Sequence, residues 1–551
     1  MRVPLLIFIF LNLLSSQKYD SLFIEAGNRG YYYKVWVYFD KKVDEKYISL
    51  SSKNLNRRVK NNSNFKSNWY DQKISEKYKK ELRRLGFQIE NESRWLNAVT
   101  VKCSKSDLSK ISNLFFVKKI EPVILRKKQR LKYEQIASYN SQRDINYGGS
   151  EAQMNQINCI AAHELGFYGQ GVRVLYIDTG YDLTHEAFDS LNLIYQYDFI
   201  NDDLNTTNET DEEIENSQDN HGTLCLSVLG GFKEGSLIGP AYKSEFLLAK
   251  TEIVAEEIQA EEDNFVAALE WGEQNGADIA VSSLGYSDWY EYEDMDGNTA
   301  VTTIAVDIAA SLGVLCVNSA GNSGNSQWNY ITAPADADSV ISVGAVDLDG
   351  NLASFSSKGP TYDGRLKPEV CALGINTYCV RSNTLSDYRT ASGTSLSSPL
   401  VGGAAAVILS ANFDLTAMQV RKALMNTASN SANPDTSLGY GVINVVDAIN
   451  YSYEMKLEKK ITTLKDFTIS KIYPNPFNPQ LNIQLTNVKG KNVKIVVHDI
   501  NGRLIENLYK GKALSFDLNI KWSPKDIPSG LYLISACSGN HKKVQKVMYL
   551  K

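Results

Sequence analysis

The chain has 551 residues, of which 43% are apolar, and its formal net charge at pH 7 is −5. This length excludes a single ordinary domain, while the apolar content is ample for one large core with smaller satellites. The near-neutral total hides three blocks of alternating sign, with net charges of +15 over residues 18–145, −32 over 146–455 and +11 over 456–551. An acidic partner in the same chain explains the basic flanks more directly than nucleic acid does.

The first residues, MRVPLLIFIFLNLLSSQ, combine an early Arg2 with an apolar run from Val3 to Leu14 and small polar residues. The run is too short to span a bilayer and predicts a secretory signal peptide over residues 1–17, with a buried strand or helix as the alternative. No other segment approaches the length of a membrane helix. We therefore expect a secreted mature protein that is extracellular or attached to the cell surface.

The sequence pattern of residues 18–145 predicts a small α+β domain. Strands are expected at 34–42, 94–103 and 115–125, and a capped helix at 104–114. The domain ends in the polar stretch RKKQRLKYEQIASYNSQRDINYG, which is typical of a cleavable linker.

The central block, 146–455, alternates short apolar runs with helical patterns. Strands are expected at 172–180, 246–253, 277–285, 313–321 and 339–347, and helices at 262–276, 299–313 and 414–428. Nearly continuous apolar strands separated by helices predict a parallel sheet covered on both faces, an α/β fold. In such folds the active site lies at the carboxyl ends of the strands.

A charged stretch around 455–466 precedes the last block, 466–551. This block reads as short strands with turn signals, including Asn501-Gly502, and predicts a small β-sandwich.

Seven cysteines are spread over the chain, which excludes a disulfide scaffold. Cys371 and Cys379 are close enough in sequence for one local bridge, and the odd total leaves at least one thiol unpaired. No CxxC or Cys/His cluster indicates a zinc site, and no metal ligand is assigned.

Asp178 ends the strand VRVLYIDTG, so its carboxylate is expected to project from the carboxyl edge of the sheet. A DTG sequence also occurs where paired aspartates share one proton. This chain has only one DTG, so an aspartic protease would have to be a dimer.

A general base that acts near neutral pH is most often a histidine. The five histidines are His163, His185, His221, His498 and His541. The last two fall in the terminal β block, which leaves three candidates. His221 is favoured because Gly222 and Thr223 lead from it into an apolar helical segment, which would aim its ring back at the strand ends.

The stretch SGTSLSSPLVGGAAAVILSA, residues 392–411, places hydroxyl residues and a proline ahead of an apolar helix. One interpretation is that Ser397, Ser398 and Pro399 are helix-start signals. The other is that Ser395 is a nucleophile at the positive end of a helix dipole, beside N–H groups that stabilise an oxyanion. Asn322, after the strand 313–321, is either a further oxyanion donor or an ordinary turn residue.

In chain order these residues resemble the motifs of the subtilisin-like serine proteases, or subtilases. The resemblance covers about residues 150–450. It rests on DTG at 178–180, HGT at 221–223, SLG at 283–285, AGNSG at 320–324 and SGTSLSSP at 392–399. Leu224, Cys225, Leu396 and Ser397 depart from the residues common in the family, and we expect them to alter packing behind the site without removing a functional group.

The resemblance implies a secreted serine endopeptidase in which Ser395 attacks a peptide carbonyl, His221 takes its proton and Asp178 orients the imidazolium. It also implies that Asn322 holds the oxyanion and that Ser283, Leu284 and Gly285 line the substrate cleft. The nucleophile lacks the GxSxG elbow of a lipase or esterase. A surface adhesin on a catalytically silent protease scaffold remains the alternative.

No cofactor is required by this chemistry, although the acidic surface leaves structural calcium open. We expect the acidic run 202–215 to be a solvated loop rather than a set of metal ligands.

Similar subtilases carry an inhibitory, fold-assisting propeptide, and residues 18–145 have the size and pattern for one. A block of charge +15 facing one of −32 predicts docking that is sensitive to salt. The terminal segment with IYPNPFNPQLNIQL (472–485) resembles the sorting domains of the type IX secretion system. The resemblance implies that this C-terminal domain contacts the secretion machinery and is removed on export. The alternative is a plain β-sandwich that is retained in the mature protein.

Overall fold

The protein is described here from a computed structural model. The described residues are 18–20, 23–43, 46–62, 65, 67–123, 125–126, 145–255, 257–258, 260–465, 468–486, 488, 490–515, 517–538 and 541–551. The predicted signal peptide and most of the predicted linker lie outside them. The chain divides into two compact units, Met1–Ser452 and Tyr453–Lys551.

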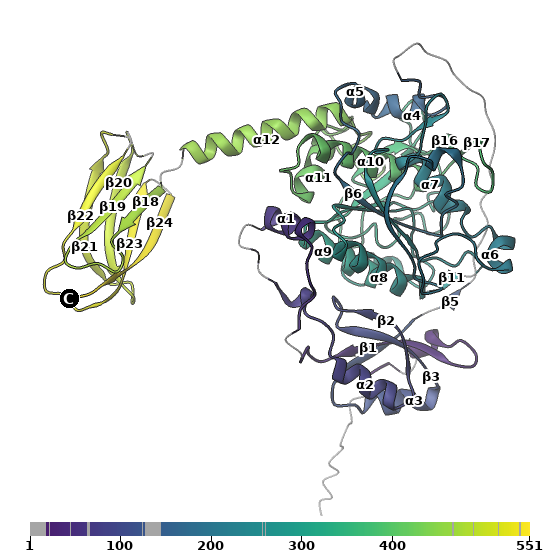
Figure 1. The fold of residues 1–551 in the computed structure, drawn as a ribbon, viewed down its shortest axis with the longest axis horizontal. Helices are drawn as coiled ribbons and strands as arrows, with labels where there is room; N and C mark the ends of the chain where they lie inside the picture. Colours follow the sequence, from purple (N-terminus) through teal and green to yellow (C-terminus); the bar gives the residue numbers. More distant parts are fainter. Residues whose placement is uncertain are drawn as a thin grey trace, which may run out of the picture. The chain divides into compact units, whose positions relative to one another are not determined.

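The N-terminal domain of the first unit is built on a four-stranded antiparallel sheet in the order β2-β3-β1-β4 (Figure 1). Its strands are β1 (Tyr33–Phe39), β2 (Gln88–Ser93), β3 (Ala98–Cys103) and β4 (Val117–Pro122), and its helices are α1 (Ser52–Asn61), α2 (Glu76–Arg84) and α3 (Lys105–Ser112). Apolar side chains of α2 and α3 pack on one face of the sheet. The predicted α+β pattern is confirmed, whereas α1, α2 and β2 were not predicted.

The second domain of this unit contains a seven-stranded parallel sheet in the order β15-β14-β13-β12-β6-β10-β7. Its strands are β6 (Arg173–Asp178), β7 (Asn192–Asp198), β10 (Glu245–Lys250), β12 (Ile279–Ser282), β13 (Leu315–Ser319), β14 (Ile341–Val346) and β15 (Val370–Leu373). All the residues of the central strands β6, β12 and β13 except Arg173 are buried, which accounts for their continuous apolar sequences. The predicted α/β fold is confirmed.

Helices cover both faces of this sheet (Figure 1). One face carries α8 (Ala260–Gln274) and α9 (Val301–Ser311), and the other carries α7 (Asn220–Gly230) and α10 (Thr394–Ala411). The remaining helices are α4 (Glu151–Gln156), α5 (Cys159–Glu164), α6 (Asp211–Asn216), α11 (Ala417–Asn426) and α12 (Val445–Lys465). The charged stretch around 455–466, for which no element was predicted, is the end of α12.

The connections reverse direction next to β6. The chain leaves β6 toward β7 on one side of the sheet, and it leaves β12 toward β13 on the other. Open α/β sheets bind ligands at such a switch point, outside the carboxyl ends of the strands. The sheet therefore places a binding site beside Asp178 and the residues that follow Ser282.

Helix α10 corrects one expectation from the sequence. Among the described residues it is the one helix long and apolar enough to cross a membrane, yet 94% of it is buried inside the protein. Its apolar surface is explained by packing, since it contacts β12, β13, β14 and β15 along its length.

The second unit contains two antiparallel sheets, β18-β19-β22 and β21-β20-β23-β24. The strands are β18 (Thr468–Tyr473), β19 (Leu481–Thr486), β20 (Asn492–Asp499), β21 (Leu504–Lys512), β22 (Leu518–Trp522), β23 (Gly530–Ser538) and β24 (His541–Tyr549). Alternate residues of β19, Leu481, Ile483 and Leu485, share one core with residues of β20, β23 and β24. This arrangement confirms the predicted β-sandwich.

Candidate active site

Asp178 and His221 are in direct contact at the carboxyl edge of the sheet. Asp178 is the last residue of β6 and is fully buried. Its Oδ1 accepts a hydrogen bond from Nδ1 of His221 at 2.6 Å and another from the N–H of Thr179 at 2.7 Å. His221 is the second residue of α7, and 28% of its side chain is exposed. The imidazole is therefore oriented by a buried carboxylate on one side and open to solvent on the other.

Glycine is required at position 222 for this contact. A Cβ there would lie 2.2 Å from the carbonyl oxygen of Gly180 and 3.1 Å from Cβ of Asp178. With no side chain, the first turn of α7 reaches the DTG turn, where the N–H of Gly222 donates to Thr179 Oγ1 at 3.1 Å. This contact thus fixes the position of the DTG motif relative to the HGT motif.

The charge of Asp178 controls the protonation of the imidazole. Burial lowers the pKa of His221, but the charge of Asp178, the neighbouring Cys225 and the hydrogen bond to Asp178 together outweigh burial, and the pKa lies well above its usual value of 6.5. The protonated form of His221 is the form that Asp178 stabilises.

Ser395 is the second residue of α10, and its carbonyl is freed by a proline. In a regular helix the N–H of residue 399 would bond to the carbonyl of Ser395, but Pro399 has no N–H. That carbonyl instead accepts hydrogen bonds from Ser283 Oγ at 2.9 Å and from the thiol of Cys225 at 3.3 Å. The interpretation of Pro399 as a first-turn residue is wrong, because the helix begins at Thr394 and the proline lies in its second turn.

Asn322 is held beside the start of α10. Its Oδ1 accepts hydrogen bonds from the N–H of Thr394 at 2.8 Å and from the hydroxyl of Thr394 at 3.0 Å. Because Oδ1 is the acceptor in both bonds, the Nδ2 group remains as the donor of this side chain. Asn322 therefore presents a hydrogen-bond donor next to Ser395.

Cys225 connects the elements that carry His221 and Ser395. It lies one helical turn after His221, with Sγ 3.8 Å from His221 Nε2, and it also contacts the carbonyl of Ser395. Burial raises the pKa of its thiol. The hydroxyl of Ser395 donates to the carbonyl of Ser283 at 3.2 Å. From the sequence, Cys225 was identified only as a departure from the residues common in the family. Its spacing of four residues from His221 indicates that the two side chains share one face of the helix.

The segment 283–285 lies alongside Ser395, and its three residues differ in exposure. Ser283 contacts Ser395 through both its hydroxyl and its carbonyl. The carbonyl of Leu284 accepts from Asn318 Nδ2 at 2.9 Å, so it is already engaged within the protein. Gly285 is exposed. Of the three, Gly285 has the backbone most accessible to a peptide.

The other two candidate histidines are placed elsewhere. His163 is buried, contacts Tyr147 Oη and the carbonyl of Pro240, and its pKa is lowered to about 4 by burial. His185 accepts from the N–H of Ala187 through Nδ1 and contacts the carbonyl of Asp387 through Nε2. Both have structural partners, so His221 is the histidine that meets Asp178.

The acidic run 202–215 is organised around a buried lysine. The ammonium of Lys250, at the end of β10, contacts Asp198 at 2.9 Å, Glu213 at 2.6 Å and the carbonyl of Thr207 at 3.2 Å. Oxygens of Asp198, Asp203 and Glu209 also lie within 4.8 Å of one another. The run is thus anchored at one end by an internal cation and is less freely solvated than the sequence suggested.

All seven cysteines are free thiols in the structure. The bridge that the sequence allowed between Cys371 and Cys379 is not formed. Cys371 Sγ instead donates to the carbonyl of Leu438 at 3.3 Å, while Cys379 lies buried in the separate strand β16 (Thr377–Val380).

A buried carboxylate, an imidazole and a helix-borne serine at the switch point of a parallel α/β sheet define the class of serine peptidases with a subtilisin-like fold. Residues 169–441 match the Subtilase family, residues 34–139 match the Peptidase S8 propeptide domain of Bacteroidota, and residues 471–550 match the Secretion system C-terminal sorting domain. Subtilisin DY of Bacillus licheniformis is 35% identical over 283 residues, which are 51% of this chain and 91% of that protein.

Serine protease AprX of Bacillus subtilis is 30% identical over 312 residues, covering 51% of this chain and 66% of that protein. Subtilisin E of the same organism is 31% identical over 294 residues, covering 53% and 69%. The chain belongs to the subtilase family. It is a serine endopeptidase with an N-terminal propeptide and a C-terminal sorting domain, and it is a secreted or cell-surface protein, as the sequence predicted.

Proposed function

We propose that Ser395 is the nucleophile of this endopeptidase, that His221 is its general base and acid, and that Asp178 orients the imidazole. The observation that carries the proposal is the 2.6 Å hydrogen bond between Asp178 and His221, beside the N-terminus of the helix that holds Ser395. No cofactor takes part in this chemistry, and calcium is assigned no role.

Catalysis begins when the Ser395 hydroxyl leaves the Ser283 carbonyl and donates to Nε2 of His221. Its oxygen attacks the peptide carbonyl carbon while His221 takes the proton, and Asp178 stabilises the imidazolium. The N–H of Ser395 and Nδ2 of Asn322 hold the oxyanion. His221 then gives the proton to the leaving amine, and water hydrolyses the acyl-enzyme by the same route.

The substrate is an extended peptide that pairs with exposed backbone next to Ser395. Gly285 supplies one edge, and Ser283 and Leu284 line the cleft beside it. A second edge of the catalytic domain is the short strand β11 (Glu257–Ile258), which pairs antiparallel with β5 (Leu125–Arg126) at the end of the N-terminal domain. Strand addition of this kind binds the main chain of a peptide regardless of its sequence. It supports an inhibitory role for residues 18–145, whose end occupies a peptide-binding edge.

We further infer the course of maturation. Residues 1–17 direct export and are removed, residues 18–145 inhibit the catalytic domain 146–455 until they are cleaved, and residues 466–551 engage the type IX secretion machinery. Proteins or peptides outside the cell are the substrates.

A serine-directed fluorophosphonate tests the proposal against a silent scaffold. The processed wild-type chain should be labelled stoichiometrically, with the adduct on the peptide that contains Ser395. His221→Ala should lose labelling because the hydroxyl is no longer activated, while His185→Ala, at a histidine outside the site, should retain it. A folded, processed chain that takes no label, or takes it at another serine, would refute the assignment.

A further inference from the structure

Helix α1 leaves the sheet of the propeptide and lies across the ends of two helices of the catalytic domain. Figure 1 shows it beside α9, away from β1–β4. Its sequence, SKNLNRRVKN, has four basic residues and no acidic one. Residues of α1 contact the C-terminal ends of both α8 and α9. The helix therefore docks outside the edge where β5 pairs with β11.

The first set of contacts satisfies carbonyl groups at helix ends. The last four carbonyls of a helix have no partner within it. Asn54 Nδ2 donates to the carbonyl of Glu273 in α8, and Asn61 Nδ2 donates to that of Ser311 in α9, both at 2.8 Å. Arg57 donates to the carbonyls that follow these helices, at Ala277 and Leu312. Positive charge is also favoured at this end of a helix dipole.

The second set of contacts is a buried ion-pair network. Arg57 and Arg58 both bind the carboxylate of Glu273, Arg58 through Nη2 at 2.9 Å and Nε at 3.0 Å. Arg58 also binds Asp71, which fixes its guanidinium within the propeptide. The side chains of both arginines are 1% exposed and that of Glu273 is 0% exposed. A network this deeply buried is only weakly screened by salt.

A glycine just beyond the end of α9 allows α1 to approach closely. Gly313, just beyond the end of α9, has a φ of +92°, and a Cβ there would lie 3.2 Å from Cβ of Asn61 and 3.3 Å from Cγ of Arg57. The close approach of α1 thus uses the space that this glycine leaves open.

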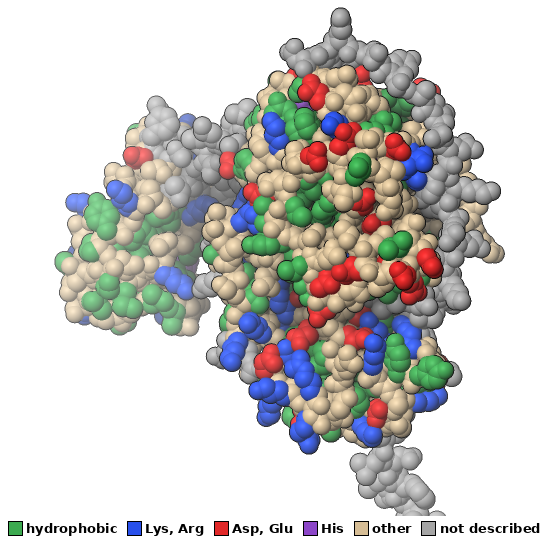
Figure 2. Space-filling view, turned by 45° about the vertical axis from the view of Figure 1, so that its right-hand side comes forward, with side chains coloured by type: hydrophobic (Ala, Val, Ile, Leu, Met, Phe, Trp, Pro, Cys, Tyr) green, Lys and Arg blue, Asp and Glu red, His purple; other side chains and the backbone are tan. Residues whose placement is uncertain are grey.

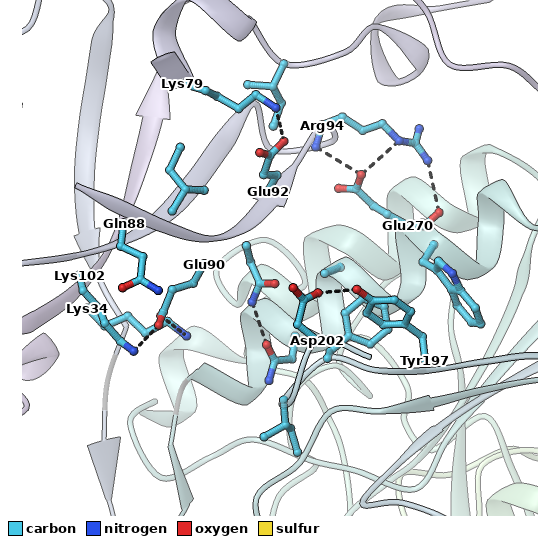
Figure 3. A pocket seen from close by; sticks show the side chains of 18 of the residues that line it. Lys34, Lys79, Gln88, Glu90, Glu92, Arg94, Lys102, Tyr197, Asp202 and Glu270 are labelled. Carbon is cyan, nitrogen blue, oxygen red and sulfur yellow. Dashed lines mark hydrogen bonds and ion pairs between the residues drawn. The ribbon is translucent and has the colours of Figure 1, made fainter. Parts of the chain in front are cut away.

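Another part of the interface is hollow. Between the propeptide and the catalytic domain lies a cavity of about 900 Å³, lined by residues of α2, β2 and α8 (Figure 3). Arg94 and Glu270 meet at its wall, while Tyr197 and Asp202 reach it from the catalytic domain. Arg57, Arg58 and Glu273 do not line this cavity. The contact made by α1 therefore lies beyond the wall of the cavity, where Arg94 Nη2 also reaches Glu273 at 3.5 Å.

We infer that residues 52–61 form a docking element of the propeptide, the α1 clasp, which retains the propeptide on the catalytic domain after the connection between them is cut. The inference rests on the proposed role of residues 18–145 as an inhibitory propeptide. Cleavage alone then leaves the enzyme latent.

The test uses the full chain with Ser395→Ala, so it does not depend on peptidase activity. A recognition site for a sequence-specific protease is inserted between residues 127 and 144, the chain is cut, and release of the propeptide after dilution is followed by gel filtration. Arg57→Met with Arg58→Met should accelerate release about 100-fold, because Glu273 loses its two close partners and keeps only Arg94, at 3.5 Å. Asn61→Ala, which removes one exposed hydrogen bond without a charge, should accelerate it about fivefold.

Arg83→Met with Arg84→Met is the matched control. These adjacent arginines are 52% and 68% exposed and pair with Glu92 and Glu81 within the propeptide. Their loss removes the same charge and should leave release within about twofold of the parent. The clasp is refuted if the Arg57/Arg58 variant releases at the parental rate, or if the control accelerates release equally. Hydrogen exchange at the C-terminal turns of α8 and α9 should rise on release.

Discussion

At the scale of single residues, Asn322 is the most specific test of transition-state stabilisation. Its Oδ1 is held by Thr394, so Nδ2 is free to meet developing negative charge. We expect Asn322→Ala to lower kcat by about 10²–10³ with little change in KM, the size known for the oxyanion asparagine of subtilisin itself. Steady-state kinetics on a peptide substrate measure this. Asn325→Ala, an exposed neighbour, should retain wild-type rates, and a loss confined to KM would contradict the assigned role.

His221 sets the acid limit of activity. The acid limb of the pH profile of kcat/KM should have its midpoint above pH 6.5. The reason is that the pKa of His221 is raised, and the protonated imidazole cannot accept the Ser395 proton. Asp178→Asn removes the charge that raises this pKa, so the midpoint should fall and kcat should drop by about 10⁴. A wild-type limb below pH 6.5 would show that Asp178 does not control the imidazole.

Motifs made the proposed site residues predictable, but their surroundings depend on three-dimensional contacts. The sequence shows that Pro399 lies near a helix start; only the start of α10 at Thr394 shows that it frees the carbonyl of Ser395. The contact of Cys225 with that carbonyl joins two distant segments, and no local pattern encodes it.

At the scale of elements, Lys250 at the end of β10 binds the acidic run 202–215 through Glu213 and the carbonyl of Thr207. Its side chain and that of Asp198 are 0% exposed, so Lys250→Met leaves a buried charge without its partner. We expect a loss of about 3 kcal/mol in stability, or roughly 6–12 °C in the melting temperature of the Ser395→Ala chain. Calorimetry measures it, with exposed Lys243→Met as the control. A shift of less than about 2 °C would contradict this role.

The elements that the sequence predicted are those whose burial is periodic or continuous. The parallel strands are apolar throughout because helices cover both faces of the sheet. Helix α1 was not predicted because its buried residues are polar or charged. Its buried residues include Asn54, Arg57 and Arg58, which are matched by partners in another domain, so it shows no apolar stripe.

At the scale of the whole molecule, the propeptide and catalytic domain carry opposite charge. Figure 2 shows Lys and Arg side chains gathered over the lower lobe and Asp and Glu side chains on the adjoining surface. We expect raising salt from 0.05 to 0.5 M, an order-of-magnitude change, to slow association of added propeptide about tenfold or more. Dissociation should change little, because the pairs at Glu273 are buried. Equal inhibition kinetics at both salt concentrations would rule out this electrostatic account.

Comparison of the wild-type chain with Ser395→Ala by intact mass and casein digestion tests whether Ser395 is the nucleophile. We expect the wild-type chain to cleave itself between residues 127 and 145 and to digest casein, while Ser395→Ala stays joined to its propeptide and is inactive. Processing and digestion by a Ser395→Ala chain, or neither by a folded wild-type chain, would contradict it.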